Sequence, residues 1–216
     1  MNNNQELFIG QTIYTKSLLS NYDRLVRAFA KFVWRCPWEK LLNLYNQNIS
    51  GNHLEVGVGS GYFLDNCRFP SENPRIALLD INLNTLEFTS KRIQRYQPTT
   101  HIANVLESIS LKIGKFDSIG FNNVIHCLPG TIPNKVKALT NLKSLLNEGG
   151  ILFGSTILGK DVQPNYLAQM TLSLYNSRRI FNSQDNLSDL KDALESNFSS
   201  YTVQLIGYSA LFTARK

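Results

Sequence analysis

The sequence lacks the long apolar runs and the leader that would assign it to a membrane or to the secretory route. No run approaches the roughly 18–20 apolar residues that a membrane-spanning helix needs. The first ten residues, MNNNQELFIG, lack the basic and apolar regions of a signal peptide. We therefore expect a cytoplasmic protein with no membrane span. The 43% of hydrophobic and 18% of charged residues are ordinary for a globular protein.

Cysteine is scarce, and its spacing excludes two further classes. Cys36, Cys67 and Cys127 are odd in number and form no CxxC pair, so the sequence predicts neither a disulfide framework nor a zinc site. We expect three reduced thiols and no metal. The net charge of +6 allows an anionic partner without requiring one.

Glycine is absent between Gln11 and Ser50, and the apolar residues there follow helical spacing. We expect residues 1–50 to form an N-terminal helical lid or appendage, and residues 51–216 to form a single globular unit. From His53 onward, short runs of Val, Ile, Leu and Phe alternate with amphipathic stretches. This alternation is typical of an α/β fold with a mostly parallel sheet covered on both faces. The closing YTVQLIGYSALFTARK predicts a C-terminal antiparallel hairpin.

Three glycines in five positions follow the first apolar run, in HLEVGVGSGYFLD. Glycines between a strand and a helix let the backbone approach a ligand closely. Tyr62 stands where a dinucleotide fingerprint would place its last glycine, and no Gly-Lys-Ser/Thr follows as a P-loop requires. Val58 and Tyr62 likewise replace the glycines that a nucleophile elbow around Ser60 would need. Three common interpretations of the turn therefore fail.

Two acidic residues restrict the class of ligand that the glycine turn could bind. Asp80 ends the next apolar run, where a carboxylate accepts hydrogen bonds from a ribose diol at the carboxyl edge of an open sheet. Glu55 precedes the glycines, and a carboxylate there would repel a bound pyrophosphate but attract a cationic group. The two acids together predict a nucleoside ligand with a cationic end.

With these features the sequence resembles the class I S-adenosylmethionine-dependent methyltransferases of the small-molecule type. The resemblance runs from Asn52 to the C-terminus and implies a Rossmann-like fold, with a mostly parallel seven-stranded sheet and helices on both faces. The motifs that carry it occur in the family's order and read LEVGVGSG, LLDIN, ANVLES, FDSIGFNNVIHCLP, LLNEGGILFGS and YTVQLIGYSALFTARK.

The resemblance also implies a set of cofactor-binding residues and S-adenosyl-L-methionine as the cofactor. Asp80 would hold the ribose hydroxyls, Glu55 would assist the amino group, and Ile81 would pack on the adenine. Asn104 replaces the more usual aspartate beside the adenine, and its carbonyl can still accept a bond from the adenine amine. The full implied set is Glu55, Gly57, Gly59, Gly61, Asp80, Ile81, Asn104, Val105 and Asn122.

His126 follows the fourth predicted strand and is our candidate catalytic residue, because an imidazole of near-neutral pKa suits removal of a substrate proton. The alternative is that His126 has a structural role and only forms a hydrogen bond within its loop. We expect Cys127 to be a packed thiol. Residues expected to contact the substrate are Tyr14, Tyr22, Asn123, His126 and Tyr166.

The predicted function is methyl transfer to an O, N or C atom of a small, apolar or aromatic metabolite. Nucleic acid is a less favoured partner, because FNNVIHCLPG lacks the Asn/Asp-Pro-Pro-aromatic stretch of enzymes that methylate base amines. An RNA methyltransferase remains an alternative through a basic helical stripe, and a non-catalytic S-adenosylmethionine-binding protein is another. The stripe consists of Arg24, Arg27, Lys31 and Arg35. The sequence does not fix the oligomeric state.

Overall fold

A seven-stranded sheet forms the centre of the molecule. The computed structural model describes residues 23, 26–109, 111–163, 165–177 and 183–216. The strands lie in the order β3-β2-β1-β4-β5-β7-β6. Neighbouring strands from β3 to β5 are parallel, whereas β7 runs antiparallel to both β5 and β6. The strands are β1 (Asn52–Val56), β2 (Arg75–Asp80), β3 (Thr99–Ile102), β4 (Phe116–Asn122), β5 (Leu146–Ile157), β6 (Ser200–Ile206) and β7 (Ser209–Arg215).

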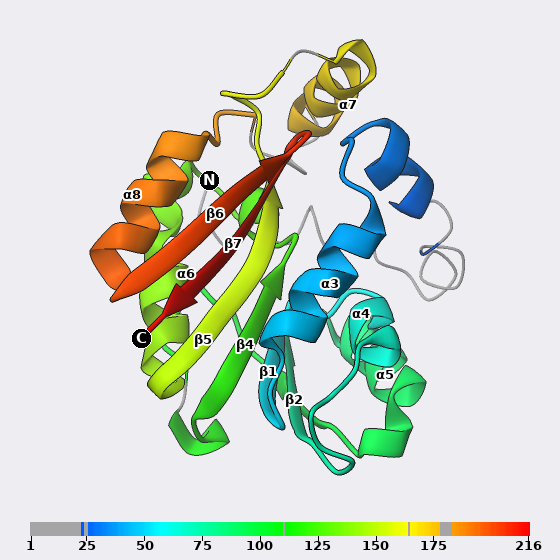
Figure 1. The fold of residues 1–216 in the computed structure, drawn as a ribbon, viewed down its shortest axis with the longest axis vertical. Coiled ribbons are helices and arrows are strands. Elements are labelled where there is room, and N and C mark those ends of the chain that lie inside the picture. The colour runs from blue at the N-terminus through cyan, green and yellow to red at the C-terminus, as the bar shows by residue number, and fades with distance from the viewer. Residues whose placement is uncertain (1–22, 24–25, 110, 164, 178–182) are drawn as a thin grey trace.

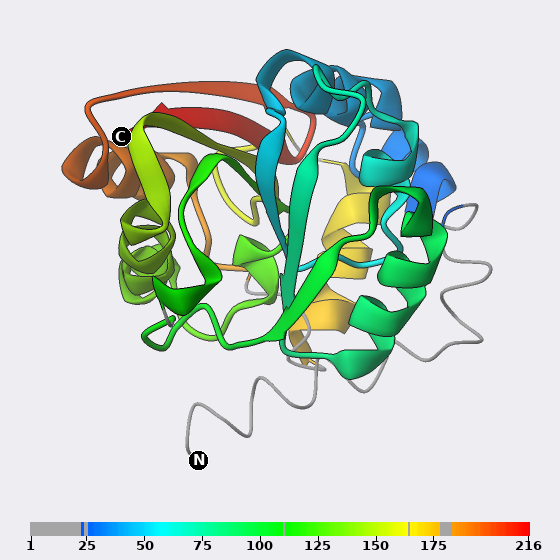
Figure 2. The same cartoon turned by 90° about the horizontal axis from the view of Figure 1, so that it is seen from below.

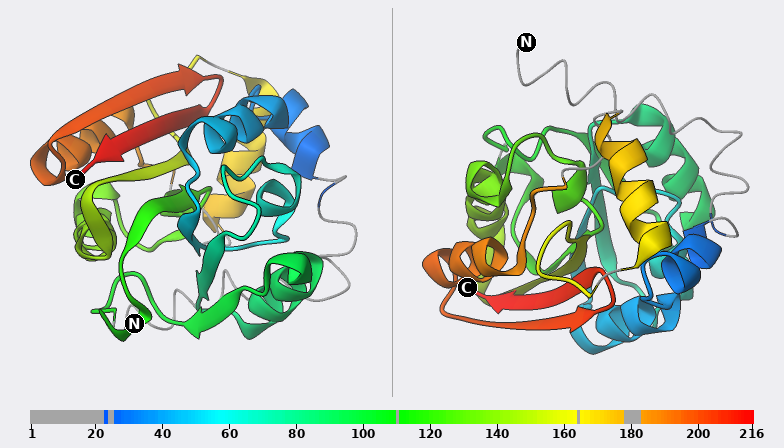
Figure 3. Two further views of the ribbon diagram at one scale, coloured as in Figure 1. Left: turned by 60° about the horizontal axis from the view of Figure 1, so that its bottom comes forward. Right: turned by 90° about the horizontal axis from the view of Figure 1, so that it is seen from above.

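Helices cover both faces of this sheet (Figures 1 and 2). On one face lie α3 (Trp38–Asn48), α4 (Tyr62–Asn66) and α5 (Leu83–Arg92); on the other lie α6 (Ile132–Ser144) and α8 (Leu187–Asn197). Helix α7 (Tyr166–Ser177) lies at the carboxyl edge of the parallel strands (Figure 3). Short 3₁₀ turns are Gln94–Tyr96, Leu111–Ile113 and Ile125–Cys127. The predicted α/β, Rossmann-like fold and its C-terminal hairpin are confirmed.

The apolar runs of the sequence are explained by burial on both faces. In β2, Ala77 and Leu79 pack into the cluster beneath α6 and α8, whereas Ile76 and Leu78 pack into the cluster beneath α3 and α5. Because successive side chains of a strand point to opposite faces, a strand covered on both sides must be apolar throughout.

One helix start differs from the sequence-based expectation. Ser188 in LSDLKDALESNF suggests an N-cap, but the N-cap of α8 is Asn186, whose side chain accepts the backbone N–H of Asp189 at 2.8 Å. Asparagine and serine cap about equally well, so the choice depends on where the incoming chain leaves the extended conformation.

Helix α3 belongs to the covering layer of the sheet. Trp38, Leu41 and Tyr45 are buried in the same cluster as Leu78 and Phe153 of the sheet. Helix α3, which precedes residue 50, is therefore closely packed against the sheet that follows it. The sequence predicts a division into lid and domain at this residue. Within the described parts of the chain, no helix is long and apolar enough to cross a membrane.

Candidate active site

A largely apolar cavity of about 450 Å³ opens at the carboxyl ends of β1, β2 and β4. The glycine turn and the ends of these strands form one part of its wall. Aromatic and aliphatic residues from segment 26–45 form another part. The cavity is therefore continuous between the predicted nucleoside site and a second, apolar compartment. Lining residues of that compartment include Val26, Phe29, Ala30, Trp34, Trp38 and Leu41.

The glycine turn has a backbone that only glycine adopts readily. Gly57, Gly59 and Gly61 all have positive φ values, of 71°, 52° and 70°. A Cβ atom added at Gly57 would lie 2.2 Å from a methyl carbon of Val124, whereas one added at Gly59 would meet nothing within 4 Å. Gly57 is thus required by packing inside the protein. Gly59 leaves open space beside the backbone, as a bound ligand needs.

Asp80 is held against the glycine turn by main-chain hydrogen bonds. Its Oδ2 accepts the N–H of Val58 at 3.0 Å, and its Oδ1 accepts the N–H of Asn82 at 2.9 Å. Burial raises the pKa of this carboxyl above its ordinary value, while hydrogen bonds from Asn82 and Val58 oppose that rise. Asp80 also lines the cavity, so its carboxylate can accept hydrogen bonds from ligand hydroxyls there.

Glu55 lies in a buried chain of polar groups. Tyr45 donates its hydroxyl hydrogen to Glu55 Oε1 at 2.5 Å, and His53 Nε2 lies 3.0 Å from Glu55 Oε2. His53 Nδ1 in turn lies 2.8 Å from the hydroxyl of Ser118. Burial, followed by the charge of Glu55, raises the pKa of Tyr45 well above its ordinary value, so this phenol remains a donor.

Sequence reasoning found Glu55 but missed its partners. His53 stands two residues before Glu55 on the same strand, so their side chains share a face, and this signal was available. Tyr45 comes from α3, and no local pattern joins it to Glu55.

The residues that the sequence predicts to lie beside an adenine also come together in the structure. Ile81, Asn104 and Val105 all line the cavity. Asn104 is oriented by its own loop, because its Oδ1 accepts the N–H of Leu106 at 3.0 Å and its Nδ2 donates to Glu107 at 3.1 Å. This orientation leaves a second lone pair of the amide oxygen for a ligand amine.

Asn122 and Asn123 follow β4 and are tied to β5. The hydroxyl of Ser155 donates to Asn122 Oδ1, and it lies 2.9 Å from Asn123 Oδ1. Asn123 has a φ of 57°, a conformation that asparagine tolerates better than most residues. Both residues line the cavity.

His126 lines the cavity, but its surroundings do not suit a base. Its Nδ1 accepts the N–H of Ile157 at 3.1 Å, and the side chain is buried with 3% of the residue exposed. Burial, followed by the charge of Lys135, lowers its pKa to about 3. Near neutral pH the ring is therefore uncharged, with a weak affinity for protons. Burial raises the pKa of the adjacent Cys127 to about 12, which keeps that thiol protonated.

Residues 26–36 and α7 together cover the apolar compartment. Trp34, Ala168, Leu172 and Tyr208 form one buried cluster, and the side chain of Asn165 donates to the carbonyl of Val33 at 2.7 Å. Seen along the carboxyl edge, α7 lies across this end of the sheet (Figure 3). Sequence reasoning missed Trp34 and Trp38 as cavity residues, because an aromatic residue at helical spacing reads equally well as core.

Tyr166, which the sequence predicts to contact substrate, is not among the residues that line this cavity. It is 74% exposed, while Ala168 and Leu172 form the buried face of α7. Two residues along a helix amount to about 200° of rotation, so Tyr166 points away from the face that Ala168 packs. Tyr175 is the α7 residue that lines the cavity. Tyr14 and Tyr22, the other tyrosines predicted to bind substrate, lie outside the described residues.

Comparison with known proteins gives consistent matches over nearly the whole chain. A family profile described as "Methyltransferase domain" matches residues 54–152. "Demethylluteothin O-methyltransferase" of Streptomyces thioluteus is 37% identical over 212 residues, which cover 97% of this chain and 92% of that protein. "Physcion biosynthesis cluster O-methyltransferase" of Aspergillus chevalieri is 33% identical over 212 residues, which cover 96% of this chain and 95% of that protein.

A solved structure supports the fold. N-methyltransferase NodS of Bradyrhizobium japonicum WM9, in complex with S-adenosyl-l-homocysteine, superposes with a TM-score of 0.59. It is 16% identical, and the match covers 82% of this chain and 84% of that one. At this identity the likeness concerns the arrangement of strands and helices.

Proposed function

The chain belongs to the S-adenosylmethionine-dependent methyltransferases that act on small molecules, and from that premise we propose that it methylates a hydroxyl group of a largely apolar acceptor. The observation that carries the proposal is the single cavity that joins the glycine turn to the compartment around Trp34 and Trp38. Oxygen is preferred over nitrogen and carbon because two relatives, at 37% and 33% identity, are named O-methyltransferases.

The residues of the turn fit an adenosyl group with a charged amino-acid end. Asp80 would accept from the ribose hydroxyls, and Ile81 with Val105 would pack on the adenine. Glu55 would attract the amino group, and Gly59 leaves space for the chain that joins the amino group to the ribose. When bound, S-adenosylmethionine supplies a methyl group on a cationic sulfonium. The apolar walls would keep water from that methyl group and orient the acceptor hydroxyl toward it.

We propose a positioning role for His126 in place of the predicted general base, so the acceptor hydroxyl would release its proton to solvent water as the O–CH3 bond forms and S-adenosylhomocysteine is left. Its Nδ1 already accepts the Ile157 N–H, and a pKa of about 3 makes protonation unfavourable near neutral pH. Its hydrogen bond fixes the end of β5 beside Asn122 and Asn123. The acceptor specificity then resides in the shape of the apolar compartment.

A panel of acceptors tests the proposed reaction. The purified protein is incubated with S-adenosylmethionine carrying a labelled methyl group and with matched aromatic compounds that offer a phenol, an enol, an amine or an activated carbon. A parallel incubation contains RNA in place of these compounds. We expect label in the phenol or enol products as a methyl ether. Label in amines alone would contradict O-methylation, label in RNA would support the RNA alternative, and cofactor binding without turnover across the panel would support a non-catalytic binding protein.

Asp80 gives a pH-dependent prediction for cofactor affinity. Replacing it by asparagine should weaken S-adenosylhomocysteine binding by about 1–3 kcal/mol, or roughly five- to 150-fold, through loss of charge-assisted hydrogen bonds. Ribose hydroxyls favour the ionised carboxylate, and the raised pKa brings protonation of free Asp80 above its ordinary range. Wild-type affinity should therefore fall as the pH is lowered from about 7 to about 4.5.

Calorimetry of S-adenosylhomocysteine binding across this pH range checks the prediction, with circular dichroism to confirm folding. Asp80→Asn should be weak at every pH in the range and nearly insensitive to it. An Asp80→Asn variant that binds as tightly as wild type, or that keeps the wild-type pH dependence, would remove Asp80 from the cofactor site.

A further inference from the structure

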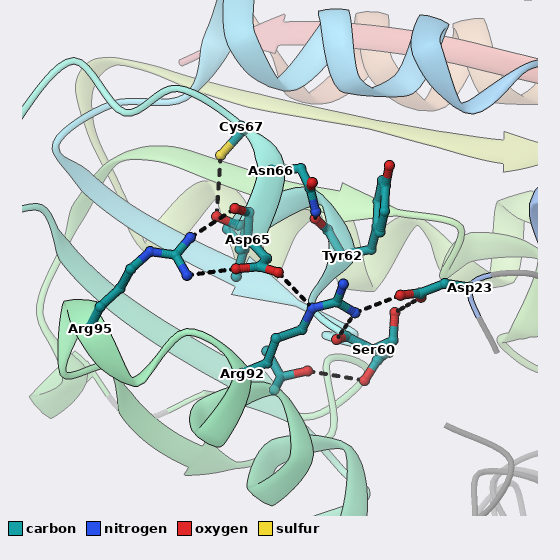
Figure 4. A network of polar contacts seen from close by, with 11 residues as sticks. Asp23, Ser60, Tyr62, Asp65, Asn66, Cys67, Arg92 and Arg95 are labelled. Carbon is teal, nitrogen blue, oxygen red and sulfur yellow. Dashed lines mark hydrogen bonds and ion pairs between the residues drawn. The ribbon is translucent and has the colours of Figure 1, made fainter. Parts of the chain in front are cut away.

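A carboxylate that lies near the cover of the apolar compartment contacts the cofactor turn. Residues 26–36 contribute Val26, Phe29, Ala30 and Trp34 to the cavity wall. Asp23 lies just before this segment, and its side chain reaches back to the glycine turn (Figure 4).

Both oxygens of Asp23 are engaged by different elements. Ser60 donates its hydroxyl hydrogen to Asp23 Oδ1 at 2.6 Å, and Arg92 Nη1 donates to Asp23 Oδ2 at 2.7 Å. The same Nη1 donates to the carbonyl of Ser60 at 3.1 Å. Asp23, Ser60 and Arg92 thus form a closed triangle between the cover, the turn and α5 (Figure 4).

Arg92 is oriented from its other side. Its Nε donates to Asp65 Oδ2 at 3.0 Å, and Arg95 holds the other oxygen of Asp65 at 2.6 Å. Asp65 belongs to α4 and has no part in the cover. Asp65 therefore helps to orient the Arg92 guanidinium toward Asp23. Because Asp65 is a second carboxylate that binds the same arginine, it serves as the control residue for Asp23.

Ser60 lies between Gly59 and Gly61 in the glycine turn. A contact that holds Ser60 in place therefore also holds the turn in place. A second contact lies near the triangle, because the guanidinium carbons of Arg27 and Arg92 are 5.9 Å and 5.5 Å from the ring centre of Tyr62. The side chains of Asp23 and Arg92 are 26% and 22% exposed. This ion pair is therefore partly buried, so salt screens it less than a fully exposed pair.

We propose that Asp23 is a positioning residue that couples the acceptor cover to the cofactor turn. The triangle with Ser60 and Arg92 sets the distance between the apolar wall at 26–36 and the glycine turn. The acceptor compartment is complete when the triangle is formed, and opening the triangle gives the acceptor a way in. This proposal rests on the proposed acceptor methylation, but its structural part is measured without turnover.

The reactivity of the Cys36 thiol can be used to measure opening of the cover. It is 1% exposed, it lines the cavity, and its N–H donates to the carbonyl of Ala30 at 2.8 Å. Opening of the cover exposes this thiol, so the rate at which an alkylating reagent modifies Cys36, followed by peptide mass spectrometry, measures the opening.

The experiment compares Asp23→Ala with Asp65→Ala in the full chain, each checked for folding by circular dichroism. We expect Asp23→Ala to be alkylated at Cys36 about three- to tenfold faster than wild type, and to raise the KM for the acceptor by a similar factor with a smaller change in kcat. Affinity for S-adenosylhomocysteine should change little. Asp65→Ala removes one support of Arg92 but keeps the contacts of Asp23 with Ser60 and Arg92, so it should accelerate Cys36 alkylation less than Asp23→Ala does. Asp23→Glu should restore part of the wild-type protection.

Two results would overturn the proposal. The first is a folded Asp23→Ala variant with wild-type alkylation of Cys36. The second is an acceleration in Asp65→Ala as large as that in Asp23→Ala, which would show that Asp23 has no special role in holding the cover. If no acceptor is methylated by the wild type, the proposed function fails, while the alkylation comparison still decides the role of Asp23.

Discussion

Replacing Lys135 with methionine is expected to lower the free energy of unfolding by about 3–5 kcal/mol. Lys135 Nζ on α6 lies 2.5 Å from Asp185 Oδ2, and the two side chains are 2% and 0% exposed. Within the described part of the chain, Asp185 Oδ1 is buried without a hydrogen-bond partner. Removal of the ammonium leaves a carboxylate with no counter-charge in an apolar region, which accounts for the expected size of the loss.

Urea unfolding followed by circular dichroism measures this loss, and a double variant provides the control. Lys135→Met/Asp185→Leu removes both charges and should recover most of the stability, because a buried ion pair contributes little relative to well-packed apolar residues. The backbone of Asp185 also accepts the N–H groups of Gly159 and Lys160, so the segment before α8 keeps other attachments. A single variant as stable as wild type would show that the pair does not hold this segment.

The sequence-predicted residues that meet at the cavity are those that depend on local pattern. Glycines after a strand require positive φ values, and an acid at the end of β2 faces the carboxyl edge whatever surrounds it. The run of Gly57, Gly59 and Gly61, with Asp80 beyond it, is therefore readable without coordinates. Their roles toward the cofactor remain predictions, whereas their meeting at one cavity is a structural finding.

The parts that the sequence does not predict depend on contacts between distant segments. Asp23 and Arg92 are 69 residues apart, and either side chain alone is an ordinary surface charge. Tyr166 and Tyr175 belong to one helix, and the choice of which one faces the cavity follows from how α7 packs on Trp34. His126 illustrates a further limit, because its pKa is set by burial that its sequence neighbours do not reveal.

Replacing Glu55 with alanine should destabilise the fold and weaken cofactor binding together. The substitution leaves the Tyr45 hydroxyl and the His53 imidazole without their acceptor, at about 1–3 kcal/mol for each buried group, and so about 2–6 kcal/mol in all. Glu55 Oε2 is closely packed against Gly120, where an added Cβ would lie 2.3 Å from it. Urea unfolding and calorimetry with S-adenosylhomocysteine measure the two effects.

Two conservative variants separate the structural role of Glu55 from its proposed contact with the amino group. Glu55→Gln keeps the shape, but its amide nitrogen cannot accept a hydrogen bond, so one buried donor loses its acceptor at about 1–3 kcal/mol. Tyr45→Phe removes only the hydroxyl, and its ring still stacks on Phe63 at 5.0 Å between centroids. This variant keeps the carboxylate, so it should lose stability while retaining affinity for the ligand. If Glu55→Gln keeps full stability and full affinity, then Glu55 neither anchors the buried chain nor binds the amino group.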